Sequence, residues 1–413
     1  MSSPALRGRM LYLVGGTGNA ERVDVSDLFV KRLAGYGLKV DYVIFSREAA
    51  GVWRKTRWRG AIAYTVGRSR RRGFVGAAIN KLIELTADLQ TCRLALIGPY
   101  DLVQIRDKFV SAVLCGWAAR LRGIRFVYWL SYPYAEHRIA HAEEGQAFLP
   151  QLSLLAAKFS AWLLYKVILP RADHVFVQSE QMLRDVESNG IPATKMTAVR
   201  MAVDEELLEK RAQIVPDTVL YLGTLIRFRR LEILLEALKL LKNEHPHAKL
   251  IFVGDGEDPR DRKFLEDRAV QLGVQESVEF TGMLPMCDAH DRAASAAVCV
   301  SPFYPTPILR STSPTKLYEY MALGRPVVVN RHPEQSAVIA ESGAGVCVEW
   351  SACAFADGIS MLFSDPVGAE RMGARGREYA RKRCIYPVIA PEVAAEYSRM
   401  LPTPSDGVAT DAG

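Results

Sequence analysis

Short apolar runs alternate with longer amphipathic stretches along the whole chain. A parallel sheet covered by helices gives this pattern, because its buried strands are continuous apolar runs and its helices are apolar on one side. In the first half the expected strands are Met10–Val14, Lys39–Phe45, Leu94–Ile97, Leu102–Ile105, Phe126–Leu130 and His174–Gln178. In the second half they are Thr218–Leu222, Lys249–Val253, Ser277–Phe280, Val298–Val300, Pro326–Val329 and Gly345–Val348.

Helices are expected between these strands, for example at Leu231–Leu241 and at Asp261–Leu272, where Gly273 suits a left-handed cap. The repeat of the pattern in both halves predicts an α/β fold of two doubly wound domains. Such sheets bind ligands outside the carboxyl ends of their strands, so we expect a site in a cleft between the domains. The expected division is an N-terminal domain over 1–208, a C-terminal domain over 213–385, a helix over 386–401 that crosses back to the N-terminal domain, and a disordered tail over 402–413.

The composition fits two globular domains. The chain has 413 residues, of which 49% are hydrophobic and 24% charged, which exceeds one small module and excludes wholesale disorder. The seven cysteines are scattered, with no CxxC motif, as in a cytosolic protein with reduced thiols. The sequence predicts neither a signal peptide nor a transmembrane span, because its richest apolar stretch, 148–169, is interrupted by two lysines.

The most informative segment is Ser311–Asn330, STSPTKLYEYMALGRPVVVN. Ser313 suits an N-cap and Pro314 the first helical position. That start of a helix leaves the backbone amides of Thr315 and Lys316 free to hold an anion at the positive end of the helix dipole.

Two further side chains belong to this predicted anion site. Arg310 and Lys316 would add positive charge, and helical spacing puts Glu319 on the same side of the helix. The alternative is a surface pair of Lys316 and Glu319, worth about 0.2–0.5 kcal/mol. A site is favoured because Gly324 ends the helix and an apolar strand follows, which makes one compact helix, turn and strand unit.

This unit resembles the signature of the nucleotide-sugar-dependent retaining glycosyltransferases of family 4, which have the GT-B fold. The resemblance extends, in the family's order, over most of 172–341. Its further segments are ADHVFVQSEQM from Ala172, MAVDEELL from Met201, YLGTLIRFRRLEILLEAL from Tyr221, LIFVGDGED from Leu250 and VEFTGMLP from Val278. It implies two Rossmann-like domains that face a central cleft, of which the C-terminal one binds a nucleotide sugar.

The resemblance also implies roles for individual residues. Glu319 is implied to hydrogen-bond the ribose of the donor, and the amides of Thr315 and Lys316 to hold its diphosphate. Arg229 stands at the position of a cation that neutralises the leaving diphosphate, and Thr224 at the position of a second one. Arg229, Lys316 and Glu319 are therefore the expected catalytic residues. A solvated basic turn before a helix is the alternative for Arg227, Arg229 and Arg230.

Further donor contacts are implied at strand ends. Ser311 stands where many family members carry a glutamate that touches the donor sugar. Gly223 and Gly254 end strands at which the backbone can approach a ligand closely, and the backbone near Met283 is implied to contact the base. In the N-terminal half, Gly16 is implied to face the cleft near the donor phosphates. Ordinary turns are the alternative for these loops.

Candidates for acceptor binding follow the strand at 126–130. The family often has a histidine or a charged residue there, whereas this chain has Leu130 and Ser131, so no catalytic base is implied. The candidates are Ser131, Tyr132, Glu136 and His137, and for His137 taken alone a surface histidine is the favoured reading.

A basic region extends from Arg54 to Lys81, with nine Lys and Arg and no Asp or Glu. Interleaved aromatic side chains suit the headgroup region of an anionic membrane, and a solvated loop is the alternative. Nucleic acid is not expected as a partner, because no nucleic-acid-binding motif accompanies the charge. The aromatic residues are Trp53, Trp58, Tyr64 and Phe74, and a second apolar stripe that belongs either to this contact or to the core is Leu152, Leu155, Phe159, Trp162 and Leu163.

Together these features predict a hexosyltransferase that is cytoplasmic and peripheral on the inner face of the plasma membrane. It would move a sugar from a nucleotide-diphosphate donor to a glycan or a polyprenyl-diphosphate-linked saccharide, in synthesis of cell-surface polysaccharide. No metal and no cofactor are expected, since Arg229, Lys316 and helix amides would meet the leaving-group charge. The alternatives are a nucleotide-sugar epimerase or phosphorylase on the same fold, and a non-catalytic protein that binds membranes or nucleic acid.

Overall fold

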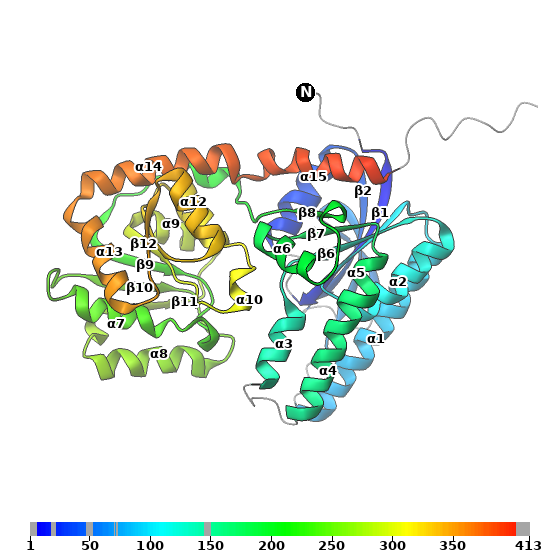
Figure 1. Cartoon of the computed structure of the whole chain (residues 1–413), viewed down its shortest axis with the longest axis horizontal. Helices are drawn as coiled ribbons and strands as arrows, with labels where there is room; N and C mark the ends of the chain where they lie inside the picture. The colour runs from blue at the N-terminus through cyan, green and yellow to red at the C-terminus, as the bar shows by residue number, and fades with distance from the viewer. Residues whose placement is uncertain are drawn as a thin grey trace, which may run out of the picture. The chain divides into compact units, whose positions relative to one another are not determined.

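The chain forms two compact units, each built around one sheet (Figure 1). The computed structural model describes residues 6–17, 22–46, 53–69, 71, 73–143 and 150–401, so the predicted tail over 402–413 lies outside the described residues. Unit 1 comprises Met1–Arg200 and Ile389–Gly413, and unit 2 comprises Met201–Val388.

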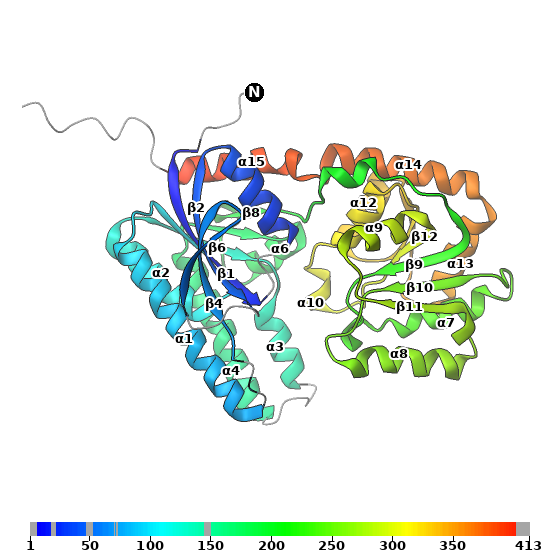
Figure 2. The ribbon, with the colours of Figure 1, turned by 180° about the vertical axis from the view of Figure 1, so that it is seen from behind.

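The sheet of unit 1 has eight strands in the order β3-β4-β2-β1-β5-β6-β7-β8 (Figure 2). Neighbouring strands pair in parallel, except that β3 and β4 form an antiparallel hairpin at one edge. The strands are β1 (Gly8–Thr17), β2 (Leu38–Ser46), β3 (Arg54–Trp58), β4 (Ala61–Gly67), β5 (Leu102–Arg106), β6 (Arg125–Leu130), β7 (His174–Val177) and β8 (Met196–Ala198).

Helices cover both faces of this sheet, because alternate strand residues point to opposite sides. One side packs against α1 (Gly73–Ile97), α2 (Phe109–Arg122) and the segment η3 (Leu164–Ile168). On the other side Phe29 of η2 (Asp24–Leu33) and Tyr397 of α15 (Tyr386–Met400) contact strand aromatics. The remaining helices of unit 1 are α3 (Tyr134–Glu143), α4 (Pro150–Leu163), α5 (Leu169–Arg171), α6 (Glu180–Ser188) and η4 (Ala193–Lys195).

The sheet of unit 2 has six parallel strands in the order β11-β10-β9-β12-β13-β14. The order reverses at β9, which is the switch point where open α/β sheets bind ligands. The strands are β9 (Val215–Leu222), β10 (Lys249–Val253), β11 (Val278–Gly282), β12 (Ala296–Ser301), β13 (Val327–Asn330) and β14 (Gly345–Val348).

Two cores sandwich this second sheet. Leu220, Cys299 and Val329 face one core, whereas Val219, Tyr221 and Phe252 face the other. The first core includes α9 (Met286–Ser295), α11 (Thr315–Ala322), α12 (Pro333–Ser342) and α14 (Pro366–Arg383). The second includes α7 (Glu232–Leu241), α8 (Pro259–Leu272) and α13 (Ala352–Ser364), and the short elements are η5 (Glu205–Glu209), η6 (Arg227–Arg229), η7 (Gln275–Ser277) and α10 (Pro307–Arg310).

The predicted α/β fold is confirmed, and most predicted strands lie within observed ones. Gly273 caps α8 with a φ of +72°, as predicted. Leu94–Ile97 is wrong as a strand, because this apolar run is the last turn of α1. A run of four apolar residues fits a strand and a helix equally well, and its continuity with the preceding amphipathic stretch decides for the helix.

The basic region forms β3, β4 and the start of α1, while Arg68 and Arg71 lie in the connection between β4 and α1. Arg59 and Gly60 have φ of +48° and +84° and make the two-residue turn between β3 and β4. Trp53 stacks on Tyr64 with ring centroids 5.3 Å apart, and Trp58 lies 5.1 Å from Tyr42. These aromatic side chains are therefore engaged in packing of the hairpin, while the side chain of Phe74 lies outside the described residues.

One helical stretch, Gln151–Arg171, is long and apolar enough to cross a membrane by length and composition, although the interrupted sequence run predicted no span. Only 22% of its most apolar window is buried. Its last turns belong to the core of unit 1, where Leu164, Ile168 and Leu169 are at most 2% exposed. That packing is typical of a helix that lies on its domain.

Candidate functional site

Three strand ends of unit 2 place glycine backbone side by side. Gly223, Gly254 and Gly282 lie at the carboxyl ends of β9, β10 and β11, and the Gly254 amide donates to the Gly282 carbonyl at 3.1 Å. Gly223 and Gly254 have φ of +146° and +133°, which side chains rarely adopt. A Cβ on Gly254 would lie 2.2 Å from the Gly223 carbonyl oxygen, so only glycine fits there.

Arg229 and Lys316 meet beside this glycine backbone. A Cβ on Gly223 would lie 3.1 Å from Arg229 Nη1 and 3.5 Å from Lys316 Cε. Arg229 Nη1 donates to the Tyr221 hydroxyl at 2.8 Å, and Lys316 Nζ lies 4.9 Å from the centroid of the Tyr221 ring. A second ring, that of Phe303, lies 5.1 Å from the same ammonium. Two of the three predicted phosphate-binding cations, Arg229 and Lys316, therefore share one location.

The electrostatics of this group follow from burial and from the two like charges. Burial of the ammonium, together with the charge of Arg229, lowers the pKa of Lys316 to about 8. Burial would raise the pKa of the Tyr221 hydroxyl, but the charges of Arg229 and Lys316 outweigh it and lower that pKa below its ordinary value. The site is thus short of negative charge, which an anionic ligand would supply.

Only one of three neighbouring arginines turns toward this site. Arg227 lies over the ring of Phe264, with its guanidinium carbon 4.3 Å from the centroid. Arg230 lies near Tyr304 and 3.9 Å from Glu232. The predicted solvated turn is therefore an apt description of Arg227 and Arg230, which are both exposed, and not of Arg229.

The start of α11 differs from the prediction. Pro314 is the N-cap and Thr315 the first helical residue, so the helix begins one residue later than predicted. The Thr315 amide donates to the Ser313 carbonyl at 3.1 Å and is not free. Within the described residues the Lys316 amide has no backbone acceptor, because its position precedes the first intrahelical hydrogen bond. One amide, rather than two, is left for an anion.

Ser313 is not the N-cap because a longer-range network holds its side chain. Its hydroxyl accepts from the Met201 amide at 3.0 Å and donates to Glu334 Oε1 at 2.7 Å. The Tyr318 hydroxyl donates to the same carboxylate oxygen. Sequence analysis missed Glu334, because it lies on α12 and its partners are not at a local spacing.

Glu319 lies one turn further along α11 and faces His290 of α9. The Nε2 of His290 is 3.5 Å from Glu319 Oε1, and these side chains are 9% and 14% exposed. His290 was not predicted as a site residue, and nothing in its sequence context signals it. Because it lies beside the Glu319 carboxylate, His290 is a candidate for a residue that positions this carboxylate.

The other residues predicted to contact the donor lie in unit 2, in the loops and short helix that follow its strands. Thr224 accepts through its carbonyl from the Tyr221 hydroxyl at 3.3 Å, so its backbone is part of the group. Ser311 is buried and bonds the Pro307 carbonyl at 3.3 Å, whereas Arg310 is exposed at the end of α10. Met283 directly follows β11 and is 76% exposed, which leaves it open to contact a ligand.

The remaining predicted residues belong to unit 1. Gly16 is exposed, with a φ of +84°, at a bulge near the end of β1. Ser131 is buried, donates to Asp107 and accepts from Arg106 Nε at 3.3 Å. That arginine is fully buried and lies 2.8 Å from Asp24. Ser131 is thus part of a buried ionic cluster.

Of the other residues predicted to bind the acceptor, Tyr132 and His137 contact each other, and Glu136 contacts η3. The Tyr132 hydroxyl lies 3.2 Å from Nδ1 of His137. Glu136 accepts from Tyr165. His137 is half-buried.

Cys287, Asp288 and Asp291 form a group of exposed side chains whose ligand atoms lie close together. The Lys210 ammonium already bonds Asp291 and lies 3.4 Å from the Cys287 sulfur. A lysine therefore occupies the place that a cation would take in this group.

Sequence families and solved structures resemble this chain over most of its length. The family described as glycosyl transferases group 1 matches residues 216–365, and the glycosyl transferase 4-like domain matches residues 28–202. No match was found among curated proteins.

Solved structures share the fold over nearly the whole chain. Sucrose-phosphate synthase from Thermosynechococcus elongatus has a TM-score of 0.68 at 18% identity, with 95% of this chain and 99% of that chain covered. Anabaena HepE in complex with UDP-glucose has a TM-score of 0.67 at 16% identity, with 95% and 100% covered. WaaG, a glycosyltransferase involved in lipopolysaccharide biosynthesis, has a TM-score of 0.65 at 16% identity, with 94% and 98% covered. The chain therefore belongs to the group 1 glycosyltransferases, family 4, with the GT-B fold.

Proposed function

We propose that the protein is a retaining hexosyltransferase that uses a nucleotide-diphosphate sugar and no metal or cofactor. Its acceptor is a glycan or a polyprenyl-diphosphate-linked saccharide of a cell-surface polysaccharide, and it works as a peripheral protein on the cytoplasmic face of the membrane. The observation that carries the proposal is the meeting of Arg229 and Lys316 at the glycine backbone of Gly223.

The chemistry of a departing diphosphate supports this assignment. Cleavage of the sugar–phosphate bond builds negative charge on the leaving diphosphate, and prearranged donors stabilise that charge in the transition state. The Arg229 guanidinium offers a bidentate fork, Lys316 a point charge, and the Lys316 amide a further donor. The Tyr221 hydroxyl and ring hold both cations in place before the donor arrives.

The same arrangement supports retention of the anomeric configuration. The Glu319 carboxylate faces His290, and we assign proton transfer to the diphosphate that Arg229 and Lys316 would hold. The hydroxyl oxygen of the acceptor would then attack the anomeric carbon from the side of the leaving group. A non-bridging phosphate oxygen of the diphosphate would take the proton of that hydroxyl. The new glycosidic bond forms as the sugar–phosphate bond breaks, and the diphosphate leaves with the proton.

Proteins of the same fold support a nucleotide sugar as the donor and a cell-surface glycan as the acceptor. HepE was solved in complex with UDP-glucose, and WaaG is a glycosyltransferase involved in lipopolysaccharide biosynthesis. We propose a comparable donor and a cell-surface glycan for this chain.

A thermal-shift measurement tests the proposal first. We expect UDP, GDP, ADP or dTDP, whichever carries the right base, to raise the melting temperature by several degrees, because a ligand that binds only the folded protein stabilises it. CMP, with one phosphate, should have little effect. The sugars of the matching nucleotide then identify the donor. The absence of a shift with every diphosphate would contradict the proposal, and an epimerised donor without acceptor transfer would contradict its transferase part.

We also expect nucleotide-diphosphate affinity to fall as the pH rises through about 8. The free protein binds a proton on Lys316 with a pKa of about 8, and the anionic ligand raises that pKa, so binding takes up a proton above this pH. The loss approaches tenfold per pH unit, and ionisation of Tyr221 acts in the same direction. Calorimetric titration between neutral and alkaline pH measures it. Lys316→Gln should bind more weakly and with a shallower profile, because only the Tyr221 contribution is left, and an equal slope in that variant would contradict the assignment.

A further inference from the structure

Three helices of unit 1 each carry a stripe of large apolar side chains on their exposed side. Successive stripe members lie three, four or seven residues apart, which at about 100° per residue keeps them on one side of each helix. Their exposed fractions lie between 39% and 74%. The stripes are Val75, Leu82, Leu85, Leu89 and Leu96 on α1, Val110, Trp117 and Leu121 on α2, and Leu152, Leu155, Phe159 and Trp162 on α4.

The buried sides of the same helices carry small residues. On α1 they include Ala87 and Ala95, on α2 Ala112, Cys115, Ala118 and Ala119, and on α4 Ala157. A helix on the surface of a water-soluble domain has the opposite arrangement, with its large apolar residues inside. The outward leucines and tryptophans are therefore placed to be covered by something outside unit 1.

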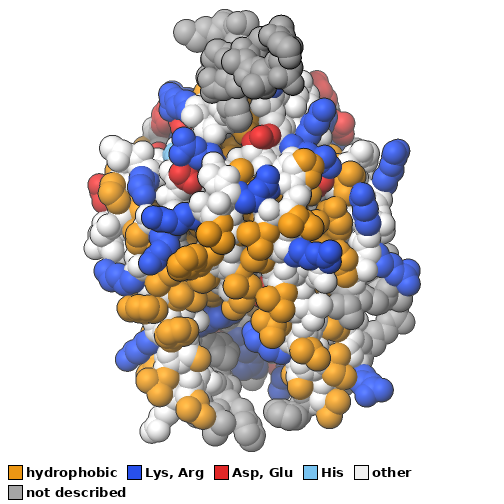
Figure 3. Space-filling model, turned by 90° about the vertical axis from the view of Figure 1, so that its right-hand side faces the viewer, with side chains coloured by type: hydrophobic (Ala, Val, Ile, Leu, Met, Phe, Trp, Pro, Cys, Tyr) orange, Lys and Arg blue, Asp and Glu red, His pale blue; other side chains and the backbone are white. Residues whose placement is uncertain are grey.

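The three stripes are neighbours. Helix α1 packs against α2, and α2 packs against η3, which continues α4. Figure 3 looks onto the side where α1 and α2 lie in Figure 1, and it shows hydrophobic side chains gathered over the middle and lower parts of this face. We call the stripes together the apolar face. An exposed apolar surface of this extent marks an interaction site.

The charge around the apolar face has one sign. The helical segments Phe109–Arg122 and Gln151–Arg171 contain no Asp or Glu. The two acids of α1 are engaged locally: Glu84 with Arg68 and with Lys108, and Asp88 with Ser111. The exposed charges on these helices are therefore basic, and they are Lys81, Arg93, Arg120, Arg122, Lys158, Lys166 and Arg171.

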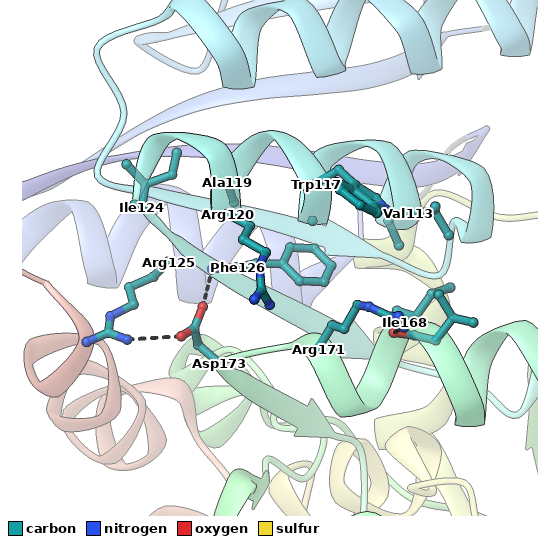
Figure 4. Close-up of a pocket in the computed structure, with 14 residues that line it drawn as sticks. Val113, Trp117, Ala119, Arg120, Ile124, Arg125, Phe126, Ile168, Arg171 and Asp173 are labelled. Atoms are coloured by element: carbon teal, nitrogen blue, oxygen red, sulfur yellow. Dashed lines mark hydrogen bonds and ion pairs between the residues drawn. The ribbon is translucent and has the colours of Figure 1, made fainter.

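A pocket of about 570 Å³ lies at the border of the apolar face, between α2 and the end of the helical stretch at Arg171. Trp117 belongs to both the pocket and the face. Figure 4 shows Trp117, Val113 and Ile168 at one end of it, while Arg125 pairs with Asp173 at 3.0 Å at the other. Arg120 and Arg171 also line it, which gives the pocket an apolar end and positive charge in excess of its single acid.

We propose that the apolar face lies in the surface of an anionic bilayer, with its stripes at the acyl boundary and the pocket around a lipid phosphate. Amphipathic helices bind bilayers in this way when large apolar residues are flanked by lysine and arginine. A second copy of the chain is disfavoured, because a two-fold interface would bring this all-basic face against itself. The inference deepens the membrane location proposed above but does not use the donor site, so the two can fail separately.

The proposal moves the membrane contact from the basic hairpin to the helices. Sequence analysis placed it around Trp53 and Trp58, which pack against other rings. The stripe of α4, for which burial in the core was the alternative, is exposed except for Leu163, which packs against the core.

Co-sedimentation of the full chain with vesicles tests the proposal. We expect binding to phosphatidylcholine vesicles that contain phosphatidylglycerol, and binding that high salt weakens but does not abolish. Leu155→Glu with Phe159→Glu should lower the bound fraction at least tenfold. Val270→Glu with Val367→Glu, at positions 62% and 63% exposed on unit 2, is the matched control and should bind as the wild type does. Arg120→Gln with Arg171→Gln should weaken the preference for the anionic lipid, because five other exposed basic side chains remain on these helices.

A second readout reports the depth of insertion. Lipids brominated on their acyl chains should quench part of the tryptophan emission, and Trp117→Phe with Trp162→Phe should remove that quenching. The melting temperature of each variant without ligand, compared with that of the wild type, shows whether it is folded. Equal binding by the Leu155→Glu, Phe159→Glu variant would overturn the proposal. So would a lack of vesicle binding, whether the protein stays monomeric or forms a dimer that the same substitutions dissociate in ultracentrifugation.

Discussion

Replacing Arg229 with glutamine is expected to lower kcat roughly 100- to 1,000-fold, the range observed when a prearranged donor to a developing anion is removed. Arg229 is the one member of its basic turn that bonds Tyr221 and borders Gly223. Glutamine keeps some hydrogen-bonding capacity but loses the charge that the leaving diphosphate requires. Steady-state turnover of the donor identified by thermal shift, with its acceptor, measures the effect.

A neighbouring arginine, Arg227, provides the control. Arg227→Gln removes the same charge from a side chain that lies over Phe264, so we expect turnover within twofold of wild type. Arg229→Lys should recover only part of the loss, because an ammonium lacks the bidentate fork. Equal losses in Arg227→Gln and Arg229→Gln would mean that general positive potential, and not the Arg229 contact, serves the reaction.

Replacing Glu319 with glutamine is expected to weaken donor binding roughly 10- to 100-fold, since a hydrogen bond to a charged group contributes about 1.5–3 kcal/mol. Its side chain is 14% exposed and its Oε1 lies 3.5 Å from His290 Nε2, so a bound ribose would meet a partly buried acceptor for its hydroxyl groups. Calorimetric titration with the nucleoside diphosphate measures the change in Kd.

A ligand without ribose hydroxyls makes this prediction specific. The wild type should bind the 2′,3′-dideoxy nucleoside diphosphate about as weakly as Glu319→Gln binds the ordinary one. The variant should bind both forms equally, because the contact is already lost. His290→Asn should give a smaller loss that disappears in the Glu319→Gln background, as expected for a positioning residue. A dideoxy penalty that persists in Glu319→Gln would move the ribose contact to another side chain.

The sequence by itself determined the architecture and the neighbourhood of the site. Alternating apolar runs predict parallel sheets because burial on both faces of a sheet is a local property of each strand. The glycines after β9 and β10, and the helix from Thr315 to Ala322 with Gly324 behind it, are readable for the same reason. Each depends on a residue and its near neighbours in the chain.

Only the tertiary structure decided which side chains act together. Met201 and Glu334 engage the Ser313 hydroxyl and shift the start of α11, and they lie far from Ser313 in sequence. Tyr221 selects Arg229 from three similar arginines, and α9 brings His290 to Glu319. Likewise, an apolar stripe has the same spacing whether a core or a bilayer covers it. These outcomes depend on contacts between distant segments, and local periodicity carries no information about which segments meet.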